Sequence, residues 1–198
     1  DKNIPFDKAI KMLKELFEHK ELTVVGQNFK YDMNVVKKYS INFKTSIEDT
    51  MLMSYVLNSG GKHDLGTLSS KFLDHEAISY EDVVGKGKDQ ITFADVDIQK
   101  AVTYACEDSD LTLLLYGKLK SKLLKDKRLY DVYRSIEIKL MLIIAEMEYL
   151  GVSIDNKELD KQSNDLKKRI DKIEKQIYSI SGREFNISSP KQIQEIFY

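Results

Sequence analysis

The feature that most constrains this sequence is an alternation of helical and short strand patterns over its first third. Apolar residues recur at helical spacing in residues 7–19 and again after Asn28, whereas residues 22–25 and 45–47 are short apolar runs. Helix, strand, helix and strand in this order predict an alternating α and β arrangement. We therefore expect an α/β fold.

The pattern becomes mainly helical after this arrangement. Apolar spacing predicts helices over residues 51–57, 65–73 and 98–124. The polar residues 74–97 between the last two are expected to form a long irregular loop, and such loops are usually functional or mobile. The loop contains Gly85-Lys86-Gly87-Lys88, which lacks the P-loop pattern. The alternative to a P-loop is that these lysines form a mobile basic loop near the phosphate backbone of a nucleic acid.

A second domain is predicted after residue 125. Residues 130–149 and 156–180 have helical patterns separated by a turn at Gly151, and no strand alternates with them. The charge balance also changes there, from acidic to basic. We expect an α/β domain over residues 1–125 and a helical segment over residues 126–198.

Composition excludes several classes of protein. With 42% hydrophobic and 32% charged residues, the 198-residue chain is neither collagen-like nor wholly disordered. No apolar run is long enough to span a membrane, and the charged start has no signal-peptide core. Cys106 is the single cysteine, and we expect it to be a core residue in a cytoplasmic protein. The net charge of −1 argues against a broad basic surface for duplex DNA.

The two ends predict a piece of a longer polypeptide. The sequence starts at Asp1 and stops at Phe197-Tyr198, within an apolar helical pattern that has no capping residue after it.

The first candidate site is Gly26-Gln27-Asn28-Phe29-Lys30-Tyr31-Asp32, directly after a predicted strand. A carboxylate near a helix start at a sheet edge is well placed to bind a metal ion. Asp32 is thus a candidate ligand. The alternative is that Asn28 caps the helix and Asp32 is a solvated acid of its first turn.

The second candidate site lies in the predicted helix over residues 98–124. Tyr104 and Asp108 are four residues apart and share one face, so a phenol and a carboxylate can converge on a water or metal. The alternative is a structural hydrogen bond between them. Together, Asp32 and Asp108 favour Mg²⁺ or Mn²⁺ over zinc, because histidine and cysteine are nearly absent.

In combination, residues 25–32, 49–52, 55–59, 85–88 and 104–110 resemble the 3′→5′ proofreading exonuclease domain of family-A DNA polymerases, the bacterial DNA polymerase I type. Two segments of the second half, residues 151–155 and 185–193, resemble the start of the polymerase domain leading into its thumb, which ribonuclease D-like exonucleases lack.

The resemblance implies an RNase H-like (DnaQ-like) fold and two-metal hydrolysis of a terminal phosphodiester, with four carboxylates holding Mg²⁺ or Mn²⁺. By motif position, Asp32 and Asp108 match metal ligands, and Tyr104 matches the tyrosine that orients the attacking water. Asn28 matches a residue near the scissile end of the strand. Positions that match contacts to the frayed single strand are Gln27, Met51, Lys62, His63 and Tyr80.

One family motif has no match in this sequence. The first exonuclease motif, D-x-E, does not precede Asp7, and neither Asp1 nor Asp7 fits it. Two carboxylates hold two Mg²⁺ ions poorly. We therefore expect little or no exonuclease activity from these residues alone, within a parent DNA polymerase that acts in replication and repair on a 3′ end and a primer-template duplex. The alternatives are a non-catalytic scaffold or DNA-binding module, and a ribonuclease D-like RNA exonuclease.

Overall fold

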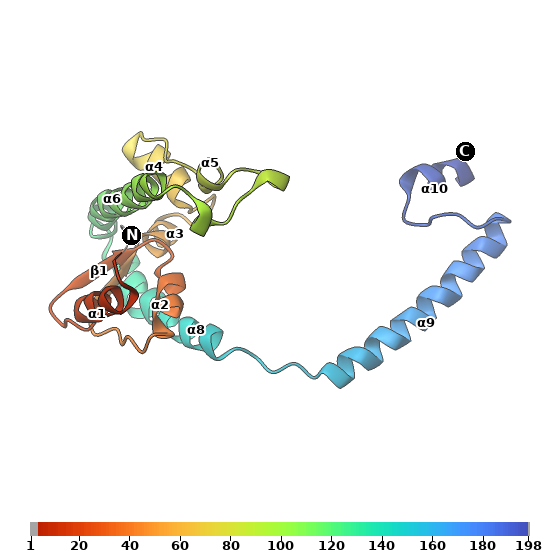
Figure 1. Ribbon diagram of the computed structural model, residues 1–198, viewed down its shortest axis with the longest axis horizontal. Helices are drawn as coiled ribbons and strands as arrows, with labels where there is room; N and C mark the ends of the chain where they lie inside the picture. Colours follow the sequence, from red (N-terminus) through yellow and green to blue (C-terminus); the bar gives the residue numbers. More distant parts are fainter. Residues whose placement is uncertain (1–3, 198) are drawn as a thin grey trace. The chain divides into compact units, whose positions relative to one another are not determined.

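The computed structural model describes residues 4–197, which form two compact units that divide between Gly151 and Val152 (Figure 1). Asp1, considered above for the first exonuclease motif, and Tyr198 lie outside the described residues.

The sheet of the first unit is a pair of parallel strands. Strand β1 (Thr23–Gly26) pairs with β2 (Ser46–Asp49), so that Gly26 lies opposite Asp49. Helix α2 (Phe29–Lys37) connects the strands, because parallel neighbours need a crossover. The predicted alternation of helices and short strands is confirmed, and in the structure it forms a parallel βαβ unit. Within residues 4–197, this parallel pair is the sheet of the RNase H-like fold that the resemblance implied.

Three helices contribute most of the first apolar cluster of this unit. Helices α3 (Thr50–Leu57) and α4 (Leu65–Leu73) pack along the long helix α6 (Ile98–Leu123), close to their predicted bounds. Their apolar faces meet because each carries leucine or methionine at helical spacing. The buried members of this cluster are Met53, Leu68, Leu115, Leu119, Leu123, Tyr133 and Ile138.

A second apolar cluster joins the sheet to helix α1 (Phe6–Phe17). Phe17 and Phe29 contact each other edge to face, with ring centroids 6.2 Å apart. This cluster fixes the βαβ unit that carries the first candidate site. Its buried members are Phe17, Phe29, Ile41, Ile47 and Met141.

The helices after residue 125 pack with the first unit up to Gly151. They are α7 (Lys127–Val132), a π-helical turn η3 (Tyr133–Glu137) and α8 (Ile138–Leu150), which runs along α2 and β2. The predicted single helix over residues 130–149 is therefore interrupted by the wider turn. Gly151, with φ of 73°, ends α8 in a conformation that glycine adopts without strain.

Residues 74–97 are more ordered than the sequence predicted. They contain helix α5 (Tyr80–Val84) and two single 3₁₀ turns, η1 (Gly87–Asp89) and η2 (Phe93–Asp95). The prediction of an irregular loop was wrong here because Ser79 and Asp82 form a reciprocal capping box that starts α5.

The second unit contains α9 (Asn156–Ser181) and α10 (Pro190–Phe197). The Asp155 carboxylate caps α9 by accepting the backbone N–H groups of Lys157 and Glu158. The exposed apolar residues of α9 lie seven, four, three and seven positions apart, so they form one stripe along the helix. They include Leu159, Leu166, Ile170, Ile173 and Ile180.

Two further expectations concern membrane-spanning helices and the burial of Cys106. In the described part of the chain, no helix is both long and apolar enough to cross a membrane. Cys106 is exposed, so its prediction as a core residue was wrong: it lies on the outer face of α6, away from the buried leucines.

Candidate active site

The first candidate site forms where β1 passes into α2. A Cβ atom at Gly26 would collide with the Phe29 ring, so glycine lets this ring pack beneath the strand end. Asn28 follows with φ of 56°, in the left-handed conformation that asparagine tolerates better than most residues. Its side chain makes no capping hydrogen bond, so the alternative that Asn28 caps α2 through its side chain was wrong.

Asp49 supplies the capping acceptor instead. Its Oδ2 accepts the Phe29 N–H at 2.7 Å, and its Oδ1 accepts the Leu52 N–H at 3.0 Å. One buried carboxylate at the end of β2 therefore serves the first turns of both α2 and α3. Sequence reasoning did not select Asp49 as a site residue, although an aspartate directly after a strand and before a helical run is a recognisable N-cap signal.

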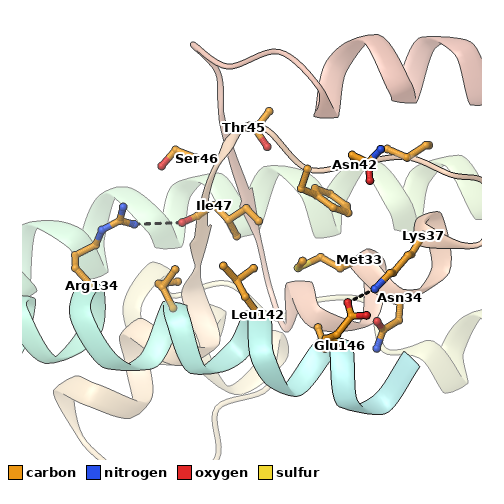
Figure 2. Close-up of a pocket in the computed structure, with 14 residues that line it drawn as sticks. Met33, Asn34, Lys37, Asn42, Thr45, Ser46, Ile47, Arg134, Leu142 and Glu146 are labelled. Carbon is orange, nitrogen blue, oxygen red and sulfur yellow. Dashed lines mark hydrogen bonds and ion pairs between the residues drawn. The ribbon is translucent and has the colours of Figure 1, made fainter. Parts of the chain in front are cut away.

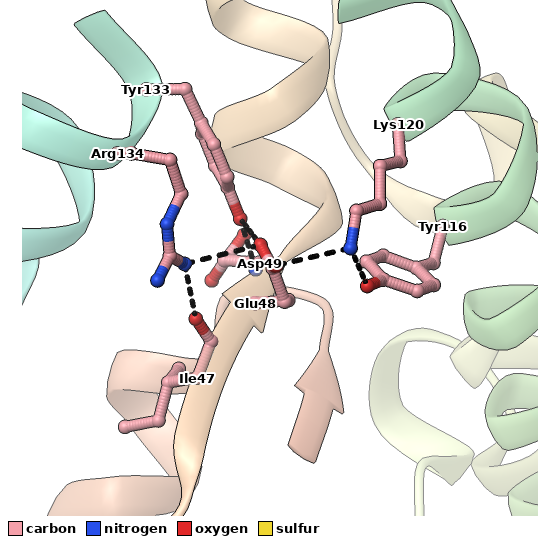
Figure 3. Close-up of polar contacts among 7 residues, drawn as sticks. All are labelled: Ile47, Glu48, Asp49, Tyr116, Lys120, Tyr133 and Arg134. Carbon is pink, nitrogen blue, oxygen red and sulfur yellow. Dashed lines mark hydrogen bonds and ion pairs between the residues drawn. The ribbon is translucent and has the colours of Figure 1, made fainter. Parts of the chain in front are cut away.

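A buried polar network holds Asp49 and its neighbour in place (Figure 3). The Tyr133 hydroxyl donates to Glu48 Oε2 at 2.6 Å and accepts the Asp49 N–H at 2.9 Å. Lys120 and Arg134 approach the Glu48 carboxylate at 3.6 and 3.5 Å. Burial together with the Glu48 charge raises the pKa of Tyr133, so its hydroxyl keeps the proton that it donates.

Asp32 lies on the first turn of α2 with an exposed side chain. Partial loss of hydration and the nearby negative charge of Asp49 raise the pKa of Asp32 above its ordinary value. A carboxylate whose charge is disfavoured in the free protein gains by pairing with a cation. This property fits a metal ligand better than a fully solvated acid.

Tyr104 and Asp108 share one face of α6, as predicted. Loss of hydration raises the pKa of Asp108, while its hydrogen bond with Tyr104 opposes that shift. Loss of hydration and the Asp108 charge raise the pKa of Tyr104 to about 12. Tyr104 is therefore a neutral phenol near pH 7, a donor rather than a base. The structural alternative and the proposed site role thus concern the same two neighbouring side chains.

Aromatic rings connect Tyr104 to Tyr80 at the start of α5. The Phe93 ring lies 6.3 Å from the Tyr80 ring, with planes 18° apart, and 6.1 Å from the Tyr104 ring. Sequence reasoning selected Tyr80 and Tyr104 but not Phe93. Phe93 was not selected because residues 74–97 were expected to be irregular, so the turn η2, which carries Phe93, was not predicted.

Gln27 and His63 contact each other within the protein. Gln27 Nε2 donates to the His63 carbonyl at 2.7 Å, and Thr50 Oγ1 donates to Gln27 Oε1 at 2.5 Å. The His63 ring nitrogen Nδ1 lies 2.9 Å from Ser54 Oγ. These contacts fasten the loop before α4 to the end of β1. Contact of Gln27 and His63 with DNA stays a prediction.

The other predicted contact residues lie at or near the surface. Lys62 is exposed, and Met51 is half-buried on α3. Met51 lines a shallow pocket of about 160 Å³ together with Asn28 and Leu52. Met51 and Asn28 are therefore brought together, on the side of the βαβ unit where Asp49 caps both helices.

Within residues 4–197, the carboxylates do not form a complete metal site. No three of the described His, Cys, Asp or Glu side chains converge as metal ligands. Asp7 is exposed in the first turn of α1. Asp32 and Asp108 are thus suitable donors singly but are short of the ligand number that Mg²⁺ requires.

A larger cleft lies elsewhere, between α2, β2 and α8 (Figure 2). It measures about 420 Å³, and none of the predicted site residues lines it. The Arg134 guanidinium donates to the Ile47 carbonyl at 3.2 Å at one end, and Lys37 pairs with Glu146 at the other. The candidate site is therefore an open surface rather than this cleft.

Comparison with known proteins gives a family match over the first part of the chain and relatives that match nearly all of it. The family described as 3′-5′ exonuclease, of DNA polymerase A, matches residues 2–124. The chain is 42% identical to DNA polymerase I of Rhizobium leguminosarum, covering 100% of this chain and 19% of that polymerase. It is 40% identical to DNA polymerase I of Pseudomonas aeruginosa, covering 97% and 21%. The chain thus spans about a fifth of the length of these relatives.

A solved structure gives the same fold. The polymerase domain of Pol1 from M. smegmatis, in complex with DNA primer-template and dNTP, matches with a TM-score of 0.69 at 22% identity. The match covers 98% of this chain and 30% of that one. The expected fold class, an exonuclease fold followed by a helical segment, is confirmed.

Proposed function

Since the chain belongs to the 3′-5′ exonuclease family of DNA polymerase A, we propose that it is the proofreading part of a DNA polymerase I, joined to the start of its polymerase domain. One observation carries this proposal: the similarity to DNA polymerase I covers the whole chain, although the exonuclease match ends at residue 124. A ribonuclease D-like exonuclease would share only the first part. The domain division proposed is residues 1–125 and 126–198.

The reaction proposed is hydrolysis of the 3′-terminal phosphodiester of an unpaired DNA strand, in replication and repair. Tyr104 is the hydrogen-bond donor and acceptor that orients the attacking water: its raised pKa keeps the phenol neutral even well above pH 7, and Asp108 lies on the same face of α6. Asn28 is free to contact the strand near the scissile bond, because its side chain caps no helix. Tyr80 offers an exposed ring for an unpaired base.

Asp32 and Asp108 would hold the divalent cation, Mg²⁺ or Mn²⁺. The raised pKa of each carboxylate supports this role, because a cation relieves the disfavoured charge. Such an ion, when bound, activates water and stabilises the leaving oxygen. Since no third described ligand joins them, we propose that residues 1–198 alone do not form the full site. The parent polymerase is proposed to act in the cytoplasm.

The test uses the DNA polymerase I that contains this chain. In that protein, Asp108→Asn should abolish Mg²⁺-dependent release of nucleotides from a labelled single-stranded 3′ end. Tyr104→Phe should slow release about 100-fold, the cost of one positioned donor. Asp110→Asn, an exposed acid two residues along the same helix, is the matched control and should leave release unchanged.

The outcomes separate the candidate functions. Primer extension should be unchanged in all three variants. Equal release by Asp108→Asn and the unsubstituted polymerase would contradict the proposed site. No release by the unsubstituted polymerase, with primer extension intact, would instead favour a non-catalytic scaffold. Faster cleavage of RNA than of DNA would favour the ribonuclease D-like reading, since the 2′-OH is the difference between them.

A further inference from the structure

Phe93 lies between two aromatic residues of the candidate site. It is near parallel to Tyr80, with ring centroids 6.3 Å apart, and its ring is 6.1 Å from that of Tyr104. Tyr80 comes from α5 and Tyr104 from α6, so the Phe93 ring is the physical link between the two helices' aromatic side chains. The proposed function so far leaves Phe93 without a role.

The segment that carries Phe93 is fixed by hydrogen bonds at its base. The Ile91 N–H donates to the Val84 carbonyl at 2.9 Å, which ties η2 to the end of α5. Thr92 Oγ1 donates to Asp95 Oδ2 at 2.6 Å and closes the η2 turn. Gly85, with φ of 85°, permits the sharp return of the chain between them. The position of the ring is therefore set before any ligand binds.

The Tyr80 and Phe93 rings remain accessible. Tyr80 is 48% exposed and Phe93 is 40% exposed. Two exposed, nearly parallel rings suit the flat faces of unpaired bases, and stacking on aromatic side chains accepts any base. Lys88 in the same segment is exposed and makes no ion pair within residues 4–197, so it is available to a phosphate.

We propose that Phe93 is a substrate-positioning residue: it stacks an unpaired DNA base beside Tyr80 and supports the Tyr104 ring from the side of the substrate. This inference rests on the proposed function. A base within a duplex has both faces covered by its neighbours, whereas a frayed base offers a free face. The Tyr80–Phe93 pair therefore favours a frayed 3′ end over a paired one.

The test measures binding of single-stranded DNA by this 198-residue chain in EDTA, so that no hydrolysis intervenes. The probe is a pentanucleotide with 2-aminopurine at its last or its second-last position, because stacking changes the fluorescence of this base. Phe93→Leu should weaken binding about tenfold, within the range for loss of one stacking partner, and should remove the stacking signal at one of the two positions. Phe93→Tyr should restore both.

The matched control is Phe6→Leu, which removes another exposed ring that packs on a tyrosine, Tyr39, at 5.3 Å. It should leave binding unchanged. Circular dichroism and thermal unfolding check that every variant is folded. Because Phe93 lies at the surface, its substitution should leave the fold intact. Unchanged binding and stacking in Phe93→Leu, beside clear binding by the unsubstituted chain, would overturn this proposal alone. Absence of binding by the unsubstituted chain would also overturn this proposal, whereas the proposed function is decided separately by nucleotide release from the parent polymerase.

Discussion

Single side chains of this site are held in unfavourable environments that serve chemistry rather than stability. Asp32 and Asp108 lose hydration beside other negative groups, which raises the pKa of each. Tyr104 keeps its proton because burial and the Asp108 charge oppose ionisation. Active sites are where such perturbations collect. The residue types could be selected from the sequence, but the direction of each shift could not, because it depends on neighbours distant in the chain.

Replacing Asp108 should therefore stabilise the protein near neutral pH. Because its pKa is raised from 3.8 in the folded state, ionisation costs stability as pH rises through and above that range. Asp108→Asn should have a higher melting temperature than the unsubstituted chain at pH 7, and the difference should vanish below pH 3.8. Thermal unfolding across this pH range checks it. Asp110→Asn is the control, and a Tm gain that is independent of pH would contradict the explanation.

The Tyr133 hydroxyl should be worth more than an ordinary hydrogen bond. Tyr133→Phe keeps the ring but leaves the buried Asp49 N–H without its acceptor and removes the hydroxyl that donates to Glu48. An unsatisfied buried group costs about 1–3 kcal/mol, so the free energy of unfolding should fall by that amount. Urea unfolding measures it. Tyr31→Phe, on a side chain that is 70% exposed, is the control, and equal stability of the two variants would refute this account.

At the scale of elements, the site is organised by where helices begin. Helices α2 and α3 both start beside the buried Asp49 carboxylate at the end of β2. The βαβ pairing brings Gly26 opposite Asp49, so the cap reaches α2 across the sheet. The bounds of most helices and strands were predicted to within a few residues, since apolar spacing is a local property. The shared cap was not, because its partners are 20 residues apart.

Loss of this shared cap should cost more than loss of a single cap. Asp49→Ala removes the acceptor of two helix starts, and each cap is typically worth about 1 kcal/mol. Asp64→Ala removes only the cap of α4, where the Asp64 carboxylate accepts the Thr67 N–H at 2.9 Å. The loss in unfolding free energy, from urea titration, should be clearly larger for Asp49→Ala. Equal losses would mean that Asp49 caps one helix only.

For the whole molecule, the boundary between compact units and the boundary of the family match differ. The exonuclease match ends at residue 124, but helices α7 and α8 continue the first unit to Gly151. Tyr133 of η3 and Ile138 and Met141 of α8 are buried in the two apolar clusters of the first unit. The start of the proposed polymerase segment is thus part of the exonuclease core.

Limited proteolysis should therefore cut after Gly151 rather than near residue 125. Val152 is 93% exposed and Ile154 is 69% exposed, between the end of α8 and the start of α9. Thermolysin, which cleaves before such residues, should release a stable fragment that ends at residue 151 or 153, identified by mass spectrometry. Accumulation of a fragment ending near residue 125 would contradict this packing.

The sequence by itself determined what is local in this protein. Apolar periodicity located the alternating helices and strands and the long helices, and motif spacing placed Asp32, Tyr104 and Asp108 on helices. Tertiary structure alone decided the contacts between distant segments. The Tyr133–Glu48 hydrogen bond joins residues 85 positions apart, and Phe93 reaches Tyr80 and Tyr104 only because the turn η2 folds back. Such contacts depend on how elements pack, and no local spacing encodes that.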